Sequence, residues 1–302
     1  MRVLLTGASG FLGRYMVDAL AQAGIETVVL GRQRPTNSVF ERFIEADLLA
    51  TQDFTALVEE SAATHLLHMA WYAEHGKYWG SPLNLRFVDS TLRLVEAFCH
   101  AGGDQVVITG TCAEYDWSQG YCREDSTPLN PATLYGTAKD AARRLAMAVC
   151  AQHQVRCAWG RIFSPYGTGE SNQRLIPSLM DVFQNKRPPF AVNATAYRDF
   201  LHASDVAAGF LALLRTGATG CYNISSGHPV PLFDLVERLA RLFDADPQAV
   251  LGLAVERLSE PPLLIGENLK LKALGWQPAL TLDQGLERTV HAAAPAHDTF
   301  CP

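Results

Sequence analysis

The sequence predicts an α/β protein built on a doubly wound parallel sheet, with a smaller, interleaved C-terminal lobe. Two observations favour this fold. Short apolar and β-branched runs alternate with amphipathic helical stretches over roughly the first third of the 302 residues. After Ser164 glycine and proline become frequent and the alternation weakens. Strands that alternate with helices imply right-handed crossovers, which place helices on both faces of a parallel sheet.

The elements of the first half follow one another in the order that such a sheet requires. Strands are predicted at residues 2–6, 26–30, 43–46, 65–70, 105–109 and 155–160. Helices are predicted between them at residues 11–23, 55–61, 84–101 and 135–152. Gly24 closes the first helix, since glycine readily adopts the left-handed conformation that ends a helix.

The second half is expected to contribute to both lobes. A helix at 176–184 is followed by a strand at 199–203 that returns to the sheet, a helix capped by Ser204 and Asp205, and a late helix region at 229–243. We find no linker, so the lobes should interleave. The larger lobe is assigned residues 1–163 and 199–221, and the smaller lobe 164–198 and 222–290.

Composition excludes several classes of protein. With 48% hydrophobic and 19% charged residues, the chain is typical of a globular protein. A net charge of −6, with both signs interspersed, provides no field for attracting nucleic acid or an anionic membrane. Neither a signal peptide nor a membrane-spanning window is predicted. The seven cysteines form no CxxC pair, so we expect no metal site, reduced thiols and a cytoplasmic protein.

A glycine-rich turn lies between the first strand and the first helix. Gly7, Gly10 and Gly13 have the spacing GxxGxxG. Glycines at these positions permit a tight turn, close approach of a pyrophosphate, and packing of the helix on the strand. The anion then lies at the helix N-terminus, where unpaired amides favour negative charge. The turn, including Ser9, Phe11 and Leu12, predicts a dinucleotide site in a Rossmann-type fold.

The end of the second strand indicates which dinucleotide is bound. A carboxylate there would bind the ribose hydroxyls of NAD, whereas an arginine suits the 2′-phosphate of NADP. The sequence has Arg32 and Arg34, and no acidic residue between Glu26 and Glu41. We therefore favour NADP(H), with Arg32 as the first phosphate ligand. The alternative is NAD(H), with both arginines solvated.

Tyr135 and Lys139 lie four residues apart, on one face of a predicted helix. A phenol is a poor acid–base catalyst at pH 7 unless a nearby cation stabilises its phenolate, and Lys139 is expected to provide that charge. Thr111 follows a predicted strand and could hydrogen-bond the same substrate oxygen. These three residues are the predicted catalytic group.

Further motifs are spread along nearly the whole chain. They comprise Asp47-Leu48, His68-Met69-Ala70, Thr111 with Tyr115, Arg161 with Phe163, Tyr166-Gly167, the run Arg198 to Asp205, Tyr222-Asn223-Ile224, Arg257 and Leu274-Gly275-Trp276. With the glycine turn and the Tyr135–Lys139 pair, they make the chain resemble an extended short-chain dehydrogenase/reductase of the nucleotide-sugar epimerase/dehydratase/reductase group.

The resemblance implies a role for each matching position. Further coenzyme-binding residues would be Asp47, Leu48, Met69, Ala70, Thr109 and Phe163. A nucleoside-diphosphate sugar would be bound by Trp71, Thr111, Cys112, Ser164, Arg174, Arg198 and Arg257. Guanidinium groups match phosphate oxygens, which independently suits Arg198 and Arg257. The helices at 85–101 and 135–152 resemble those that form a four-helix bundle in homodimers of this group.

Departures from the group's patterns narrow the reaction. The resemblance implies an Asp-Glu pair after the hydroxyl residue in 4,6-dehydratases, but Cys112 and Ala113 follow Thr111. The cysteine expected of reductive 3,5-epimerases is replaced by Ala113. The sequence therefore favours an NADPH-dependent reductase of a nucleoside-diphosphate 4-keto-(6-deoxy)sugar, with Tyr135 as proton donor. The alternative is a 4-epimerase with tightly bound NAD. A non-catalytic dinucleotide sensor is disfavoured, because Tyr135 and Lys139 are both present.

The segment 71–79 is unusually aromatic and follows the strand at 65–70. Loops at the carboxyl ends of parallel strands are where ligands bind. Two interpretations stay open: the segment forms a wall against the substrate, or it packs on its own lobe or on a second subunit.

Overall fold

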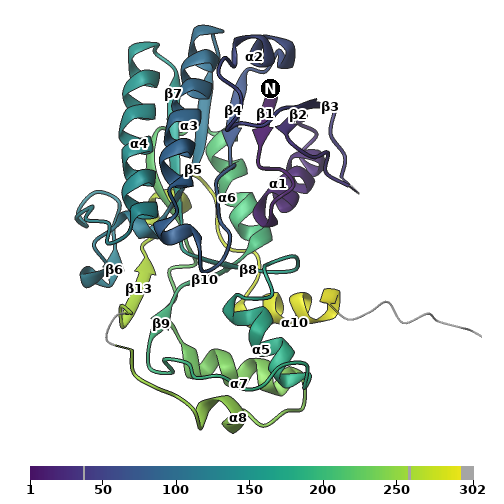
Figure 1. Ribbon diagram of the computed structural model, residues 1–302, viewed down its shortest axis with the longest axis vertical. Helices are drawn as coiled ribbons and strands as arrows, with labels where there is room; N and C mark the ends of the chain where they lie inside the picture. Colours follow the sequence, from purple (N-terminus) through teal and green to yellow (C-terminus); the bar gives the residue numbers. More distant parts are fainter. Residues whose placement is uncertain (37, 258–259, 294–302) are drawn as a thin grey trace, which may run out of the picture.

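The computed structural model, which describes residues 1–36, 38–257 and 260–293, has a parallel sheet above a smaller group of helices (Figure 1). The sheet has the strand order β11-β7-β5-β4-β1-β2-β3, and every pair in it is parallel. Its strands are β1 (Arg2–Thr6), β2 (Glu26–Gly31), β3 (Arg42–Glu45), β4 (His65–His68), β5 (Gln105–Thr111), β7 (Arg156–Ile162) and β11 (Gly220–Ile224). The predicted doubly wound sheet is confirmed.

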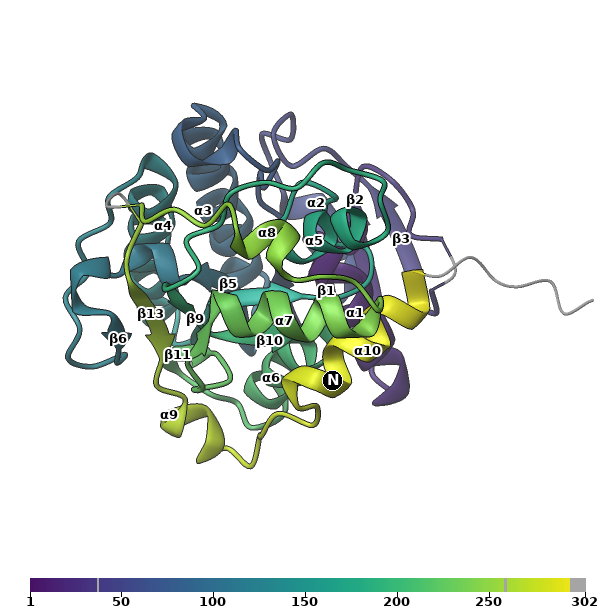
Figure 2. The same cartoon turned by 90° about the horizontal axis from the view of Figure 1, so that it is seen from below.

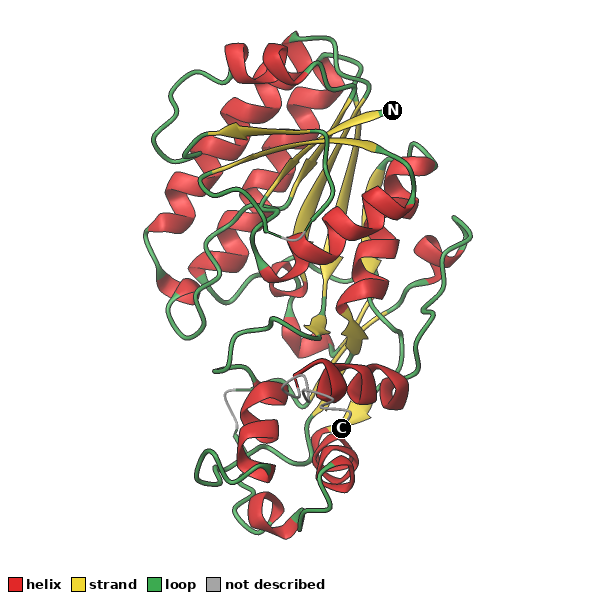
Figure 3. Cartoon of the chain, turned by 90° about the vertical axis from the view of Figure 1, so that its right-hand side faces the viewer, coloured by secondary structure: helices red, strands yellow, loops and turns green. Residues whose placement is uncertain are grey.

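Helices cover both faces of this sheet (Figure 3). On one face lie α1 (Phe11–Gln22) and α6 (Ala203–Arg215), and on the other α2 (Thr55–Ser61), α3 (Leu83–His100) and α4 (Leu134–Gln152). Each face has its own apolar core: Met16 and Phe210 belong to the first, and Leu94 and Phe98 to the second. Burial of these side chains supplies most of the free energy that holds the helices on the sheet.

The remaining elements form the smaller lobe (Figure 2). Its helices are α5 (Leu175–Phe183), α7 (Leu232–Leu242), α8 (Gln248–Leu251) and α10 (Leu282–Ala293), with the short α9 (Leu269–Lys272) against α6 and β11. Leu179, Leu235, Leu239 and Leu286 form part of a separate core there. Two small sheets complete the lobe: β8 (Ser164–Tyr166) with β10 (Phe200–His202), and β12 (Val230–Pro231), β9 (Tyr197–Arg198), β13 (Leu263–Gly266) and β6 (Tyr121–Cys122).

The structure corrects three sequence predictions about the second half. The strand predicted at 199–203 does not return to the main sheet, since β10 pairs with β8. The seventh strand of that sheet is instead β11, so the lobe boundary predicted at 221/222 falls inside a strand. The N-cap of α6 is His202, whose side chain accepts from the Ser204 amide.

Asp205 does not cap α6 either. Its buried carboxylate accepts hydrogen bonds from the Ala279 and Leu280 amides, at 3.0 and 3.2 Å. This contact fixes the segment that leads into α10. In the part of the chain that the structure describes, no helix is long and apolar enough to cross a membrane.

Candidate active site

One cavity of about 1350 Å³ extends from the glycine-rich turn, past the carboxyl ends of β1, β4 and β5, to the smaller lobe. Every residue that the sequence predicts for catalysis, coenzyme binding or substrate binding lines it, except Arg34. The guanidinium carbon of Arg34 lies 5.0 Å from the centre of the Phe40 ring instead. Strand order reverses between β1 and β4, the position at which doubly wound sheets bind ligands.

The backbone of the turn forms a cradle that side chains would fill. A Cβ on Gly13 would lie 2.0 Å from the Gly7 carbonyl oxygen, and one on Gly7 would lie 2.7 Å from the Ala70 amide nitrogen. Gly7 also has a φ of +78°, which glycine adopts without strain. Gly10 is the N-cap of α1 and makes no side-chain cap, so the amides of the first turn remain open to an anion. These residues fit a dinucleotide pyrophosphate.

At the far end of the cradle, β2 ends on Gly31, and Arg32 and Gln33 line the cavity directly after it. Arg32 is exposed. Asp47 and Leu48 form the opposite side, where the Asp47 carboxylate accepts from the Leu49 amide at 2.9 Å. This end of the cavity therefore has an exposed guanidinium where the sequence predicts the 2′-phosphate.

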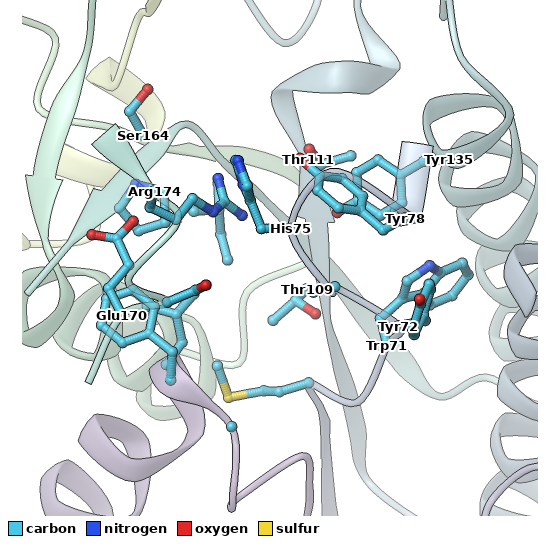
Figure 4. Close-up of a pocket in the computed structure, with 18 of the residues that line it drawn as sticks. Trp71, Tyr72, His75, Tyr78, Thr109, Thr111, Tyr135, Ser164, Glu170 and Arg174 are labelled. Carbon is cyan, nitrogen blue, oxygen red and sulfur yellow. The ribbon is translucent and has the colours of Figure 1, made fainter. Parts of the chain in front are cut away.

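Of the predicted catalytic residues, Thr111 and Tyr135 lie close together in the cavity (Figure 4), and Lys139 lines it as well. Thr111 is the last residue of β5, and Tyr135 and Lys139 lie on the first turns of α4. The Thr111 hydroxyl oxygen accepts from the Ala113 amide at 3.2 Å, so its proton is left to donate. The Lys139 ammonium donates to the Thr109 carbonyl oxygen at 2.8 Å and lies 3.9 Å from the centre of the Trp71 ring.

The electrostatics differ from the sequence prediction that Lys139 makes the phenol acidic. Burial, followed by the nearby Tyr78, raises the pKa of Tyr135, although a hydrogen bond with Thr111 opposes the rise. Burial also lowers the pKa of Lys139 to about 7, against the attraction of Glu114. The reason is geometric: Lys139 is directed at Thr109 and Trp71 and is itself desolvated. Tyr135 is therefore protonated at neutral pH, the form a proton donor requires.

The aromatic segment 71–79 packs on its own lobe and also lines the cavity, while a contact with substrate stays a prediction. Trp71 packs on its own lobe, stacked on Phe87 at 5.5 Å and donating to the Asn84 side-chain oxygen at 2.8 Å. Tyr78 and Trp79 instead meet the Tyr135 ring edge to face, at 4.8 and 5.7 Å between centroids. These two rings wall the cavity next to the phenol.

The three predicted substrate arginines lie at the opposite end. Arg174 lies over the Tyr78 ring at 5.8 Å. Arg198 donates to the Pro261 carbonyl oxygen at 2.8 Å and lies 3.5 Å from a Glu260 oxygen. Arg257 pairs with the same carboxylate at 3.0 Å. Ser164, on β8, lines the cavity between these arginines and β5. Arg198 and Arg257 therefore lie around one carboxylate, and Arg174 lines the same cavity. Guanidinium groups match the oxygens of a diphosphate.

Sequence reasoning missed two carboxylates of this cavity region. Glu114 is fully buried and pairs with Arg161 at 2.7 Å. Glu170 lines the cavity beside Arg174, and one of its oxygens is buried without a hydrogen-bond partner. Burial raises the pKa of Glu170 to about 8, although Arg174 opposes the shift. The spacing of Thr111 and Glu114 is that of a capping box, but it does not reveal the distant partners Arg161 and Trp159. The burial of Glu170 likewise depends on contacts that the local sequence does not show. Among the described residues no group of three side chains is placed to hold a metal ion.

Comparisons with known proteins agree with this geometry. A model of the NAD dependent epimerase/dehydratase family matches residues 3–225. The chain is 27% identical to a UDP-glucose 4-epimerase of Azospirillum brasilense, over 97% of this chain and 95% of the relative. It is 22% identical to a dTDP-D-glucose 4,6-dehydratase of Mus musculus, over 96% of this chain and 87% of the relative.

Solved structures show the same likeness along the whole chain. MoeE5, in complex with UDP-glucuronic acid and NAD, has a TM-score of 0.83 and 26% identity, and the match covers 96% of this chain and 98% of MoeE5. The UDP-glucose 4-epimerase of Thermus thermophilus, in complex with NAD, has a TM-score of 0.82 at 22% identity, with the same coverage. At that identity the second match shows a shared fold.

Proposed function

The chain belongs to the NAD dependent epimerase/dehydratase family, and from that premise we propose that it is an NADPH-dependent reductase of a nucleoside-diphosphate 4-keto-(6-deoxy)sugar. It is an enzyme with oxidoreductase-type chemistry, as its relatives are. The observation that carries the proposal is the convergence of Thr111, Tyr135 and Lys139 on one cavity, next to Cys112 and Ala113. This group can move one proton at a substrate oxygen, but it offers no Asp-Glu pair for dehydration.

In the proposed reaction, a bound NADPH supplies the hydride to C4 of the sugar. Tyr135 donates its proton to the C4 oxygen, which the Thr111 hydroxyl also contacts. Lys139, whose amine donates to the Thr109 carbonyl oxygen, would hold the coenzyme ribose as an ammonium. Tyr78 and Trp79 exclude water from the phenol. Arg174, Arg198 and Arg257 bind the diphosphate.

NADP(H) is proposed over NAD(H) because Arg32 lines the cavity directly after β2, with no carboxylate on that strand end. A reductase must exchange its coenzyme at each turnover, which agrees with an open adenosine end. Phe163, Met69 and Thr109 line the groove that leads from the glycine turn to Tyr135. We propose that they contact the coenzyme.

The second candidate is a nucleotide-sugar 4-epimerase with tightly bound NAD. The 27% identity with the UDP-glucose 4-epimerase of Azospirillum brasilense favours it. The same three residues serve both reactions, since an epimerase oxidises C4, turns the keto sugar and returns the hydride. The two candidates differ in whether the coenzyme leaves.

The deciding experiment is a panel of UDP-, dTDP-, GDP- and CDP-linked 4-keto sugars, assayed for NADPH consumption. Stoichiometric oxidation of NADPH supports the reductase. The epimerase would be the correct function if nicotinamide coenzyme co-purifies with the protein and UDP-sugars are interconverted without added NADPH. Tyr135→Phe keeps the aromatic contacts and removes the proton, so turnover should fall at least about 100-fold while coenzyme still binds.

We also propose the division of labour between lobes and a homodimer. Residues 1–163 and 199–221, with the rest of β11, would bind coenzyme, and residues 164–198 and 225–290 substrate. Leu85 on α3 and Leu145 on α4 are 59% and 49% exposed, so these helices offer an apolar surface for a second copy. Sedimentation of wild type and Leu145→Glu, with a monomer expected only for the variant, tests the pairing.

A further inference from the structure

Glu114 is a buried carboxylate beside the catalytic group. It ends the short helix η2 (Cys112–Glu114), which directly follows Thr111. Its side chain is fully buried. One oxygen accepts from the Thr111 amide at 2.9 Å and from the Trp159 indole at 2.8 Å, and the other accepts from Arg161 Nε at 2.7 Å.

The network continues from Arg161 into the smaller lobe. Arg161 donates to the Tyr115 hydroxyl at 2.9 Å, and that hydroxyl donates to the Asn223 side-chain oxygen at 2.8 Å. The Asn223 amide group donates to the carbonyl oxygens of Cys122 and Glu267, both at 3.0 Å. The side chains of this hydrogen-bond network hold one another in place, so the Glu114 carboxylate is kept in one position.

The backbone leaves room for this arrangement at Gly110. A Cβ there would lie 2.0 Å from the Trp159 indole nitrogen and 2.7 Å from a Glu114 oxygen. A buried ion pair is costly to desolvate and is weak evidence for stability by itself. The hydrogen bond between its carboxylate and the amide of the catalytic Thr111 is what points to the reaction.

Glu114 acts on Thr111 through the backbone. The Thr111 amide is held by the carboxylate, and the Thr111 hydroxyl oxygen is held by the Ala113 amide, which together form a capping box. Both contacts leave the hydroxyl proton free to be donated to a group other than this turn. Loss of the carboxylate would free the turn that aims this hydroxyl.

Glu114 also acts on Lys139 through charge. Arg143, one helical turn beyond Lys139 on α4, lies 3.9 Å from the Glu114 carboxylate, which places this negative charge near Lys139. Glu114 raises the pKa of Lys139 against the effect of burial, and Lys139 in turn lowers the pKa of His68 on β4. The charged groups that face Glu114 itself are Arg161 on β7 and, at 3.9 Å, Arg143 on α4. Glu114 additionally raises the pKa of Tyr135 and of Cys112.

We propose that Glu114 is a positioning residue for the reaction, which fixes the hydroxyl of Thr111 and places a negative charge near Lys139. This role rests on the proposed reductase. In this proposal Thr111, Tyr135 and Lys139 contact substrate or coenzyme. Glu114 contacts neither and acts through those residues.

Glu114→Gln tests the role, since it keeps the shape and removes the charge. Without that charge both Lys139 and Tyr135 lose their protons at lower pH. The alkaline limb of the kcat profile should therefore move to lower pH, by about one unit or more. At pH 7 kcat should fall at least about tenfold, with a smaller change in KM for the sugar. An unmoved limb would overturn the proposal.

Two controls separate charge from structure. Trp159→Phe removes one donor to Glu114 but keeps its charge, so the alkaline limb should stay in place. Should Glu114→Gln fail to fold, Glu114→Gln with Arg161→Gln replaces the ion pair by a neutral pair, and the same displaced limb is expected. A limb that moves equally in Trp159→Phe would assign the effect to packing and reject the proposal.

A measurement without substrate keeps this proposal distinct from the proposed function. Acetylation of Lys139 by acetic anhydride, followed against pH by mass spectrometry, reports when its amine becomes neutral. Half-reaction is expected near pH 7 in the wild type and at lower pH in Glu114→Gln. Identical curves would disprove the electrostatic role, whereas a wild type inactive on every 4-keto sugar would disprove only the reductase.

Discussion

The coenzyme end and the substrate end of the cavity differ in the groups that line them, which are backbone atoms at the first and side chains at the second. At the coenzyme end the surface is backbone: Gly7, Gly10 and Gly13 exclude side chains, and α1 presents its first amides. At the substrate end the surface is charged side chains, among them Arg174, Arg198 and Glu170. Backbone geometry tolerates almost no substitution, whereas side-chain contacts are changed one at a time. Specificity should therefore be adjustable at the second end and not at the first.

The largest effect is expected where backbone contacts backbone. Gly13→Ala would place a Cβ 2.0 Å from the Gly7 carbonyl oxygen, so α1 must move away from β1. Coenzyme binding should be lost, and thermal unfolding should occur many degrees lower. Gly24→Ala is the matched control: it has a φ of +67° but open space, and should cost only about 1 kcal/mol. If both substitutions lowered coenzyme affinity equally, the close backbone contact at Gly13 would not be what forms the coenzyme end of the cavity.

This contrast explains what the sequence could predict. The glycine turn, β1 and α1 are adjacent in the chain, so their spacing and periodicity contain the relevant information. The ends of β1 and of α2 are found at the predicted residues. The predicted strand at 199–203 was wrong about its partner, because pairing of β10 with β8 is decided by contacts that are not local.

The substrate arginines should show the next largest effect. Arg198 is 15% exposed and Arg257 47% exposed, and both contact Glu260. Arg198→Ala removes a partly buried guanidinium and should raise KM for the nucleotide sugar by about 10- to 100-fold. Arg257→Ala should raise it severalfold less, because solvent screens the exposed group. Steady-state kinetics on both variants measure these changes in KM. A larger increase for Arg257→Ala than for Arg198→Ala would contradict the assignment of Arg198 as the stronger diphosphate ligand.

The catalytic side chains were predictable to the extent that they share a local pattern. Tyr135 and Lys139 are one helical turn apart, and Thr111 ends a strand with a clear apolar run. The partners of Glu114 were not predictable, because Trp159 and Arg161 lie on β7 and meet the residue only after β5 and β7 pair. The pKa of Tyr135 was also mispredicted, since spacing gives no account of burial.

A smaller effect is expected where the cavity ends next to β2, at the proposed site of the coenzyme's adenosine. Side chains, and not backbone atoms, line the cavity there. Arg32 is exposed and lines the cavity. Arg32→Ala should reduce the preference for NADPH over NADH in kcat/KM by about tenfold, the equivalent of roughly 1.4 kcal/mol. Arg34→Ala should leave the preference unchanged, since Arg34 lies on Phe40 outside the cavity. An unchanged preference in Arg32→Ala would remove the basis for proposing NADP(H).

The smallest effect concerns Glu170, which has one buried carboxylate oxygen without a hydrogen-bond partner among the described residues. Burial raises its folded-state pKa to about 8, above the ordinary value of 4.5, so the folded state favours the protonated form. Its stabilising contribution is complete below about pH 4.5 and is lost as pH rises through about 8. Glu170→Gln cannot ionise, so its Tm should fall less than that of the wild type between pH 5 and 9, by a few degrees. Glu59→Gln, on the exposed surface of α2, controls for the loss of one carboxylate. Parallel Tm curves for wild type and Glu170→Gln would mean that the carboxyl is solvated, and that the substrate end contains no such buried charge.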